Sequence, residues 1–156
     1  MSWWINRVER TLSEEVVAPP VDVRDFYVDL DNLKLVHPLI ASVRMLSNDQ
    51  TDDGYVREYR VADRIPFGRF TLKTVYRARV HVLMRGPDLL VLTEADQPPG
   101  VRLRGTVSFE PVPRGTRLTE RLFIEAPRPL GAFTVREAVK AHAAMLAGIR
   151  AHFESG

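Results

Sequence analysis

The sequence predicts an α+β fold in which a long C-terminal helix covers one face of an antiparallel sheet. Five turn-forming clusters divide the middle of the chain into segments of about 9 to 16 residues, which are rich in Val, Leu, Thr, Tyr and Phe. After these segments, residues 134–153 repeat apolar side chains at helical spacing. Because an amphipathic helix buries its apolar face, we expect it to pack on the sheet that precedes it.

Seven strands are expected. The first covers residues 5–17, and the other six cover residues 39–50, 55–65, 69–84, 89–97, 101–111 and 116–127. Apolar side chains alternate with charged ones in the segments 69–84, 101–111 and 116–127. Such alternation is typical of an antiparallel sheet that is covered on one face and exposed to solvent on the other.

Two short helices are expected between the first two strands. Pro20 suits the first turn of a helix, and apolar residues recur at helical spacing over residues 23–30. A second helix is expected over residues 32–36. It ends at His37, because a residue before proline avoids helical backbone angles.

The terminal helix has a start motif and one unusual position. Residues 134–137 (Thr-Val-Arg-Glu) fit a capping box, with Phe133 at the position of a hydrophobic staple. The apolar stripe contains Val135, Ala138, Val139, Met145, Leu146, Ile149 and Phe153. His142 lies at the centre of that stripe, where a polar side chain needs a partner.

Composition excludes several classes of function. The chain of 156 residues is long enough for one domain, residues 1–156, with 45% apolar and 27% charged residues. It contains no cysteine, which excludes disulfides and thiol catalysis. The net charge of +2 is spread along the chain, which argues against nucleic-acid binding. No apolar run could span a membrane and no signal peptide is visible, so we expect a cytoplasmic protein, either a monomer or a homodimer.

No motif for a cofactor or a metal is visible, and we expect neither. The sequence has no glycine-rich phosphate loop, no nucleophile elbow and no His-Glu-x-x-His motif. The four histidines are His37, His81, His142 and His152, and their spacing does not match that of metal ligands.

Polar residues on the buried faces are the candidate functional residues: Arg57, Tyr59, Asp63, Tyr76, Glu120 and His142. Two interpretations remain open. They could satisfy one another in the core, for example Glu120 with Arg57. Alternatively, they could form a small polar set inside an apolar pocket, which is the usual build of a small-molecule site. A set of His142, Glu120 and Tyr76 could also perform general acid–base catalysis.

The order of elements resembles the helix-grip superfamily, which includes START-like lipid-binding domains and polyketide cyclase/dehydrase-like proteins. The residues that carry the resemblance are 18–21 leading into Phe26, 31–38, 115–118 and the terminal helix. Where many relatives have a tryptophan near the second short helix, this chain has Leu35-Val36-His37. The resemblance implies a curved seven-stranded antiparallel sheet with two short helices and a long C-terminal helix packed over its concave face, and a largely apolar cavity between helix and sheet.

We therefore expect a ligand pocket between the terminal helix and the sheet. Its expected binding residues are Tyr59, Tyr76, Val80, Leu103, Val107, Leu118, Glu120, Leu122, Ala138, His142, Met145 and Ile149. Loops at residues 66–68, 98–100 and 128–131 are expected to gate it.

Three functions remain open at this stage. The first is binding of a hydrophobic small molecule such as a lipid, an isoprenoid or a polyketide. The second is a cofactor-independent cyclase, aromatase or dehydratase that acts in the same cavity. The third is a partner-binding module that uses the sheet edge and Trp3-Trp4. Fold alone does not choose among them.

Overall fold

A computed structural model describes residues 4–86, 89–98, 100–129 and 131–155. The strands are β1 (Ile5–Val16), β2 (Ile40–Thr51), β3 (Gly54–Phe67), β4 (Phe70–Leu83), β5 (Leu90–Gln97), β6 (Val101–Val112) and β7 (Gly115–Pro127). The helices are α1 (Pro20–Val28), α2 (Leu30–Val36) and α3 (Gly131–Glu154). Trp3, Pro87, Asp88, Pro99 and Leu130, which belong to the expected turns, gate and N-terminal contact, lie outside the described residues.

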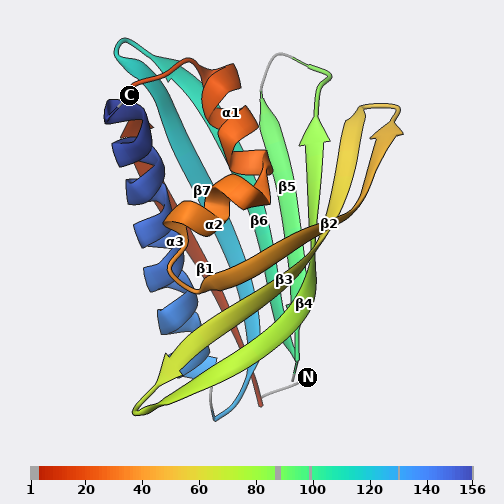
Figure 1. The fold of residues 1–156 in the computed structure, drawn as a ribbon, viewed down its shortest axis with the longest axis vertical. Helices are drawn as coiled ribbons and strands as arrows, with labels where there is room; N and C mark the ends of the chain where they lie inside the picture. Colours follow the sequence, from red (N-terminus) through yellow and green to blue (C-terminus); the bar gives the residue numbers. More distant parts are fainter. Residues whose placement is uncertain (1–3, 87–88, 99, 130, 156) are drawn as a thin grey trace.

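The seven strands form one antiparallel sheet in the order β1-β7-β6-β5-β4-β3-β2. Figure 1 shows α1 and α2 lying over one face of the sheet while α3 runs along its β1 and β7 side. The predicted fold class, a helix-grip α+β fold, is confirmed. Because the alternation of buried and exposed side chains marks the strands clearly, each predicted strand end lies within about two residues of the observed one.

The two short helices form where the sequence predicts helices. Pro20 occupies the first turn of α1, where its missing N–H is not needed. The Asp29 side chain caps α2 by accepting a hydrogen bond from the backbone N–H of Asp31. α2 ends at Val36 with His37 as its C-cap, as expected from the proline that follows His37.

The terminal helix begins earlier than the sequence predicted. α3 starts at Gly131, so Thr134 lies inside the helix and the predicted capping box is wrong. Gly131 packs tightly on the sheet, because a Cβ there would lie 2.9 Å from the Cβ of Asn6. This close approach lets α3 start directly against β1. Phe133 therefore lies inside the helix and not at the staple position before it.

The main core fills the space between the sheet and the three helices. It contains Tyr27 and Leu33 from α1 and α2, Val107 and Leu118 from the sheet, and Met145 and Ile149 from α3, together with other buried residues. A smaller cluster around Leu122, Ile124 and Val135 lies under the first half of α3.

α2 packs closely on α3 at Gly148. A Cβ at position 148 would lie 2.8 Å from the Cβ of Val36, which is closer than real side chains approach. The absence of a side chain at this position therefore sets the separation of the two helices.

Candidate ligand-binding pocket

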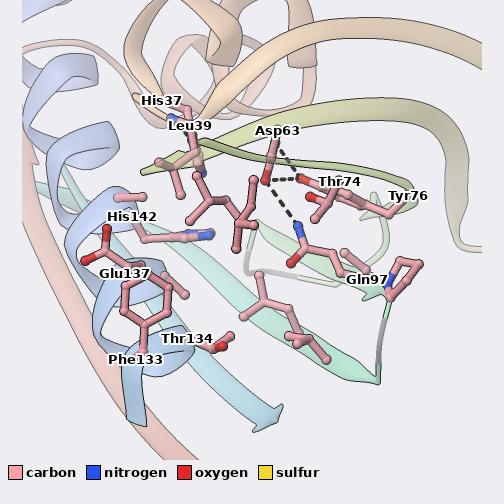
Figure 2. A pocket seen from close by; sticks show the side chains of 18 of the residues that line it. His37, Leu39, Asp63, Thr74, Tyr76, Gln97, Phe133, Thr134, Glu137 and His142 are labelled. Atoms are coloured by element: carbon pink, nitrogen blue, oxygen red, sulfur yellow. Dashed lines mark hydrogen bonds between the residues drawn. The ribbon is translucent and has the colours of Figure 1, made fainter. Parts of the chain in front are cut away.

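A pocket with a cavity volume of about 140 Å³ lies between α3 and the concave face of β3, β4, β5 and β6 (Figure 2). Its wall is mostly apolar and includes Ile65, Phe67, Leu72, Ala95 and Leu103. The polar residues in the wall are His37, Asp63, Thr74, Tyr76, Gln97, Thr134, Glu137 and His142. An apolar cavity with a few polar groups is the usual form of a small-molecule site.

The structure divides the expected binding residues into two groups. Tyr76, Leu103, Ala138 and His142 line the pocket. The others lie in the packed core and not in the pocket wall: Tyr59, Val80, Val107, Leu118, Glu120, Leu122, Met145 and Ile149. The reason is that side chains of α1 and α2 fill the deep part of the concave face, and this pocket lies beside the first half of α3.

His142 is anchored from behind by Glu120. The Nδ1–H of His142 donates to Oε1 of Glu120 at 2.6 Å, and the Tyr27 hydroxyl donates to the other carboxylate oxygen. The Glu120 side chain is fully buried, whereas that of His142 keeps 14% exposure. With Nδ1 engaged, the Nε2 side of the ring is the part of His142 available to the pocket, toward which Figure 2 shows the ring extending.

The Glu120 pair controls the charge of His142. Burial lowers the pKa of His142, but the neighbouring Glu120 carboxylate, with a smaller contribution from Asp63, raises that pKa above 6.5 overall. Tyr27 is affected in the opposite sense, because burial and the same carboxylate raise the pKa of its hydroxyl well above 10.0. Tyr27 is therefore a neutral donor that holds Glu120 in place.

His37 contacts His142 but stays neutral. Its Nδ1 accepts a hydrogen bond from the backbone N–H of Leu39 at 3.2 Å. Burial, together with the positive charge of His142, lowers the pKa of His37 to about 3. The pocket therefore contains one histidine that favours protonation and one that resists it.

A second polar set comes from the opposite wall. The Tyr76 hydroxyl donates to both carboxylate oxygens of Asp63 at 3.2 Å, and Gln97 Nε2 donates to Oδ2 at 3.1 Å (Figure 2). Burial raises the pKa of Asp63 despite these bonds. The Thr74 hydroxyl beside them is buried and has no hydrogen-bond partner among the described residues.

The match to a family model decides the family. A model described as "Polyketide cyclase / dehydrase and lipid transport" matches residues 7–154. The chain belongs to this family. The resemblance drawn from the order of elements is thereby confirmed. A search of curated proteins finds no match to the chain.

Solved structures share the fold over nearly the whole chain. The protein TTHA0849 of Thermus thermophilus is 20% identical with a TM-score of 0.69, and 97% of each chain is covered. The Zhui aromatase/cyclase of Streptomyces sp. R1128 is 14% identical with a TM-score of 0.67, covering 96% of this chain and 94% of that one. A START superfamily protein of Mycobacterium smegmatis is 18% identical with a TM-score of 0.69, covering 96% and 97%. At these identities the likeness establishes the fold.

Some pocket residues of this family member escaped sequence reasoning. The sequence marks His37 only as the end of a helix, because the following Pro38 restricts its backbone and says nothing of where its side chain points. Gln97 precedes a turn, and nothing in its local sequence signals its inward direction. Asp63 does give a signal, because it shares the strand face of buried Tyr59.

The described part of the chain adds two limits. No cluster of three or more His, Cys, Asp or Glu side chains within it could hold a metal ion. None of its helices combines the length and hydropathy that crossing a bilayer requires.

Proposed function

We propose that this protein binds a small apolar molecule that carries a hydrogen-bonding oxygen, with the oxygen on His142. The candidate ligands are a lipid, an isoprenoid or a polyketide-like compound, of which a ring-sized part enters the pocket. The observation that supports this proposal is the Glu120–His142 pair, which orients an imidazole of raised pKa beside an apolar cavity. A leucine at position 142 would line the cavity without any polar cost, so packing alone does not account for the histidine.

The volume of the cavity limits how much of a ligand it can enclose. A volume of about 140 Å³ is close to that of an apolar cavity known to hold a benzene ring. Pocket side chains such as Phe67 and Leu72 are partly exposed, so the remainder of a longer ligand can extend into solvent. One ring or a short branched segment fits inside.

A matched pair of probes tests this function. p-Cresol and p-xylene have nearly the same shape and differ by a hydroxyl in place of a methyl group. The protein should bind p-cresol more tightly, and His142→Leu should weaken p-cresol by about 1–3 kcal/mol while leaving p-xylene unchanged. Ligand-observed NMR measures both affinities.

The control is His81→Leu, the same substitution on the outer face of the sheet, where His81 contacts Asp53 and not the pocket. It should leave both affinities unchanged. If p-cresol and p-xylene bind equally to the native protein, the proposed role of His142 is wrong. Native mass spectrometry of the purified protein then identifies any hydrophobic molecule that remains bound.

A cyclase or dehydratase is the second candidate, and one observation favours it. His142 and Asp63 reach the pocket from opposite walls, and the pKa of each is raised. A dehydration needs one group to remove a carbon-bound proton and another to protonate the departing hydroxyl, which leaves as water. If this reaction takes place, His142→Leu should lower turnover of a β-hydroxy ketone by roughly 100-fold or more while binding is retained.

A further inference from the structure

The tip of the β3–β4 hairpin carries exposed apolar side chains beside the pocket. Phe67, Phe70 and Leu72 are 41%, 68% and 44% exposed. Phe67 and Phe70 are directly opposite each other in the register, and alternation places Leu72 on the same concave face. Phe67 and Leu72 also line the pocket, and Phe67 contacts Phe133 of α3. The apolar tip is therefore continuous with the pocket wall.

The same hairpin concentrates positive charge. Residues 59–77 contain five cations, and the single carboxylate among them, Asp63, is buried in the pocket wall. The cations are Arg60, Arg64, Arg69, Lys73 and Arg77, all of them exposed. None of the five makes an ion pair with any residue that the structure describes.

The register places these cations directly against one another. Arg60 is opposite Arg77 and also opposite Arg44 of β2, and Arg64 is opposite Lys73. Like charges in direct cross-strand pairs destabilise a sheet. Across the rest of the same sheet face, arginines are matched with acids, as Arg104 is with Glu94 and Arg121 with Glu9. The hairpin therefore keeps an unfavourable arrangement that an anionic partner would relieve.

We propose that this hairpin docks the protein on a membrane surface that contains anionic phospholipids. An apolar element at such a surface inserts about 5–10 Å into the boundary between headgroups and acyl chains. Arg64 and Lys73 lie three residues from Phe67 and Phe70, which at the rise of a strand is about 10 Å. Insertion of the two aromatic rings thus brings both cations to the level of the phosphates.

The combination of features favours a membrane over an acidic protein. The row of cations on the outer face of the hairpin would by itself be sufficient to bind an acidic protein. Such a partner would not require two exposed phenylalanines at the very end of the hairpin, on the opposite face. Docking by the tip uses both features together and turns the adjoining pocket wall toward the bilayer, where hydrophobic molecules dissolve.

Co-sedimentation with vesicles tests the proposal. The native protein should partition onto equimolar phosphatidylcholine–phosphatidylglycerol vesicles and only weakly onto phosphatidylcholine alone. Reversing the two cations next to the tip, with Arg64→Glu and Lys73→Glu, should reduce the partition about tenfold or more. Phe70→Ser should reduce it several-fold on the same vesicles, and because Phe70 is the most exposed of the three apolar side chains the fold should survive.

The matched control is Arg10→Glu with Arg114→Glu, which changes the net charge equally at exposed positions outside the hairpin. This pair should retain nearly all of the partition. The proposal is overturned if the native protein shows no preference for anionic vesicles, or if the control pair loses as much binding as the hairpin pair. It is also overturned if the protein binds a polyglutamate resin but not the vesicles, which would indicate an acidic protein partner.

Ligand binding in solution separates this proposal from the proposed function. Arg64 and Lys73 point away from the pocket, so their reversal should leave p-cresol binding unchanged. Loss of vesicle binding with intact p-cresol binding supports docking by the hairpin whatever the ligand is. If p-cresol does not bind the native protein at all, the vesicle result still decides the docking proposal.

Discussion

The rings of His37 and His142 meet edge to face with their centres 5.3 Å apart, yet the pKa values of the two residues move in opposite directions. Glu120 pairs with His142 and stabilises its proton. His37 has no carboxylate partner among the described residues, and both its burial and the charge of His142 lower its pKa. The histidine on α3 therefore favours its proton and the one at the end of α2 resists it, although both line the same cavity.

His37 should make the fold less stable in acid. Its folded pKa of about 3 lies below the ordinary 6.5, so the unfolded chain takes up a proton that the folded protein rejects. The contribution of neutral His37 to the free energy of unfolding is fully present above pH 6.5. It is lost as the pH falls toward 3, at up to about 1.4 kcal/mol per pH unit. Urea unfolding at a series of pH values should show this slope, and His37→Gln should flatten it. An unchanged slope in that variant would assign the acid sensitivity to other groups.

Glu120→Gln should uncouple His142 from its anchor. The amide offers one acceptor oxygen where the carboxylate accepts from both His142 and Tyr27, so one buried donor loses its partner. The pKa of His142, followed by NMR, should fall, because the main influence that raises it is removed. The free energy of unfolding should drop by about 3 kcal/mol. Glu137→Gln, the same substitution on the same pocket's wall, is the control and should change neither quantity by a comparable amount.

Enlarging Ala138 should close the pocket. Ala138 lines the cavity from α3, and a tryptophan there would occupy much of the 140 Å³. Ala138→Trp should abolish binding of p-cresol and of apolar dyes while the circular dichroism spectrum is retained. Val107→Ala, a change in the packed core, should lower stability by about 2 kcal/mol and leave binding nearly intact. Equal loss of binding in both variants would contradict the assigned position of the pocket.

The loops around the pocket should respond to ligand. Phe67 and Pro98, which belong to two of the three expected gating loops, line the cavity. Amide hydrogen exchange at Phe67, Gly68 and Gly100 should be faster than in the middle of the strands and should slow when ligand binds. Protection that is uniform and indifferent to ligand would count against a gate at these loops.

The strands could be predicted from the sequence because alternation is a local property of each segment. The start of α3 could not, since it depends on the contact between Gly131 and Asn6 across 125 positions of the chain. The suggested pairing of Glu120 with Arg57 is wrong for a similar reason. Tyr27 and His142 occupy both oxygens of Glu120, whereas Arg57 turns toward the backbone carbonyl of Val28.

The candidate site was predicted in part. The polar position in the stripe of α3 was visible because its neighbours are apolar, and it does reach the pocket. The depth of the pocket was not visible, because it depends on how the side chains of α1 and α2 fill the concave face. Alternation places Val107 and Leu103 on the same face, but only tertiary packing decides that one is core and the other pocket wall.

The missing side chain at Gly148 extends its influence to the chemistry of the cavity. Position 148 lies six residues along α3 from His142, and the Val36 that it admits is the residue just before His37. The contact between Gly148 and Val36, neither of which is charged, thus influences how near the imidazole of His37 comes to that of His142. A methyl group added there would act as a wedge between the helices. It would reduce the burial that chiefly lowers the pKa of His37 and, with it, the repulsion from His142. The pKa of His37 thus depends in part on the spacing of two helix backbones at a glycine six residues from His142.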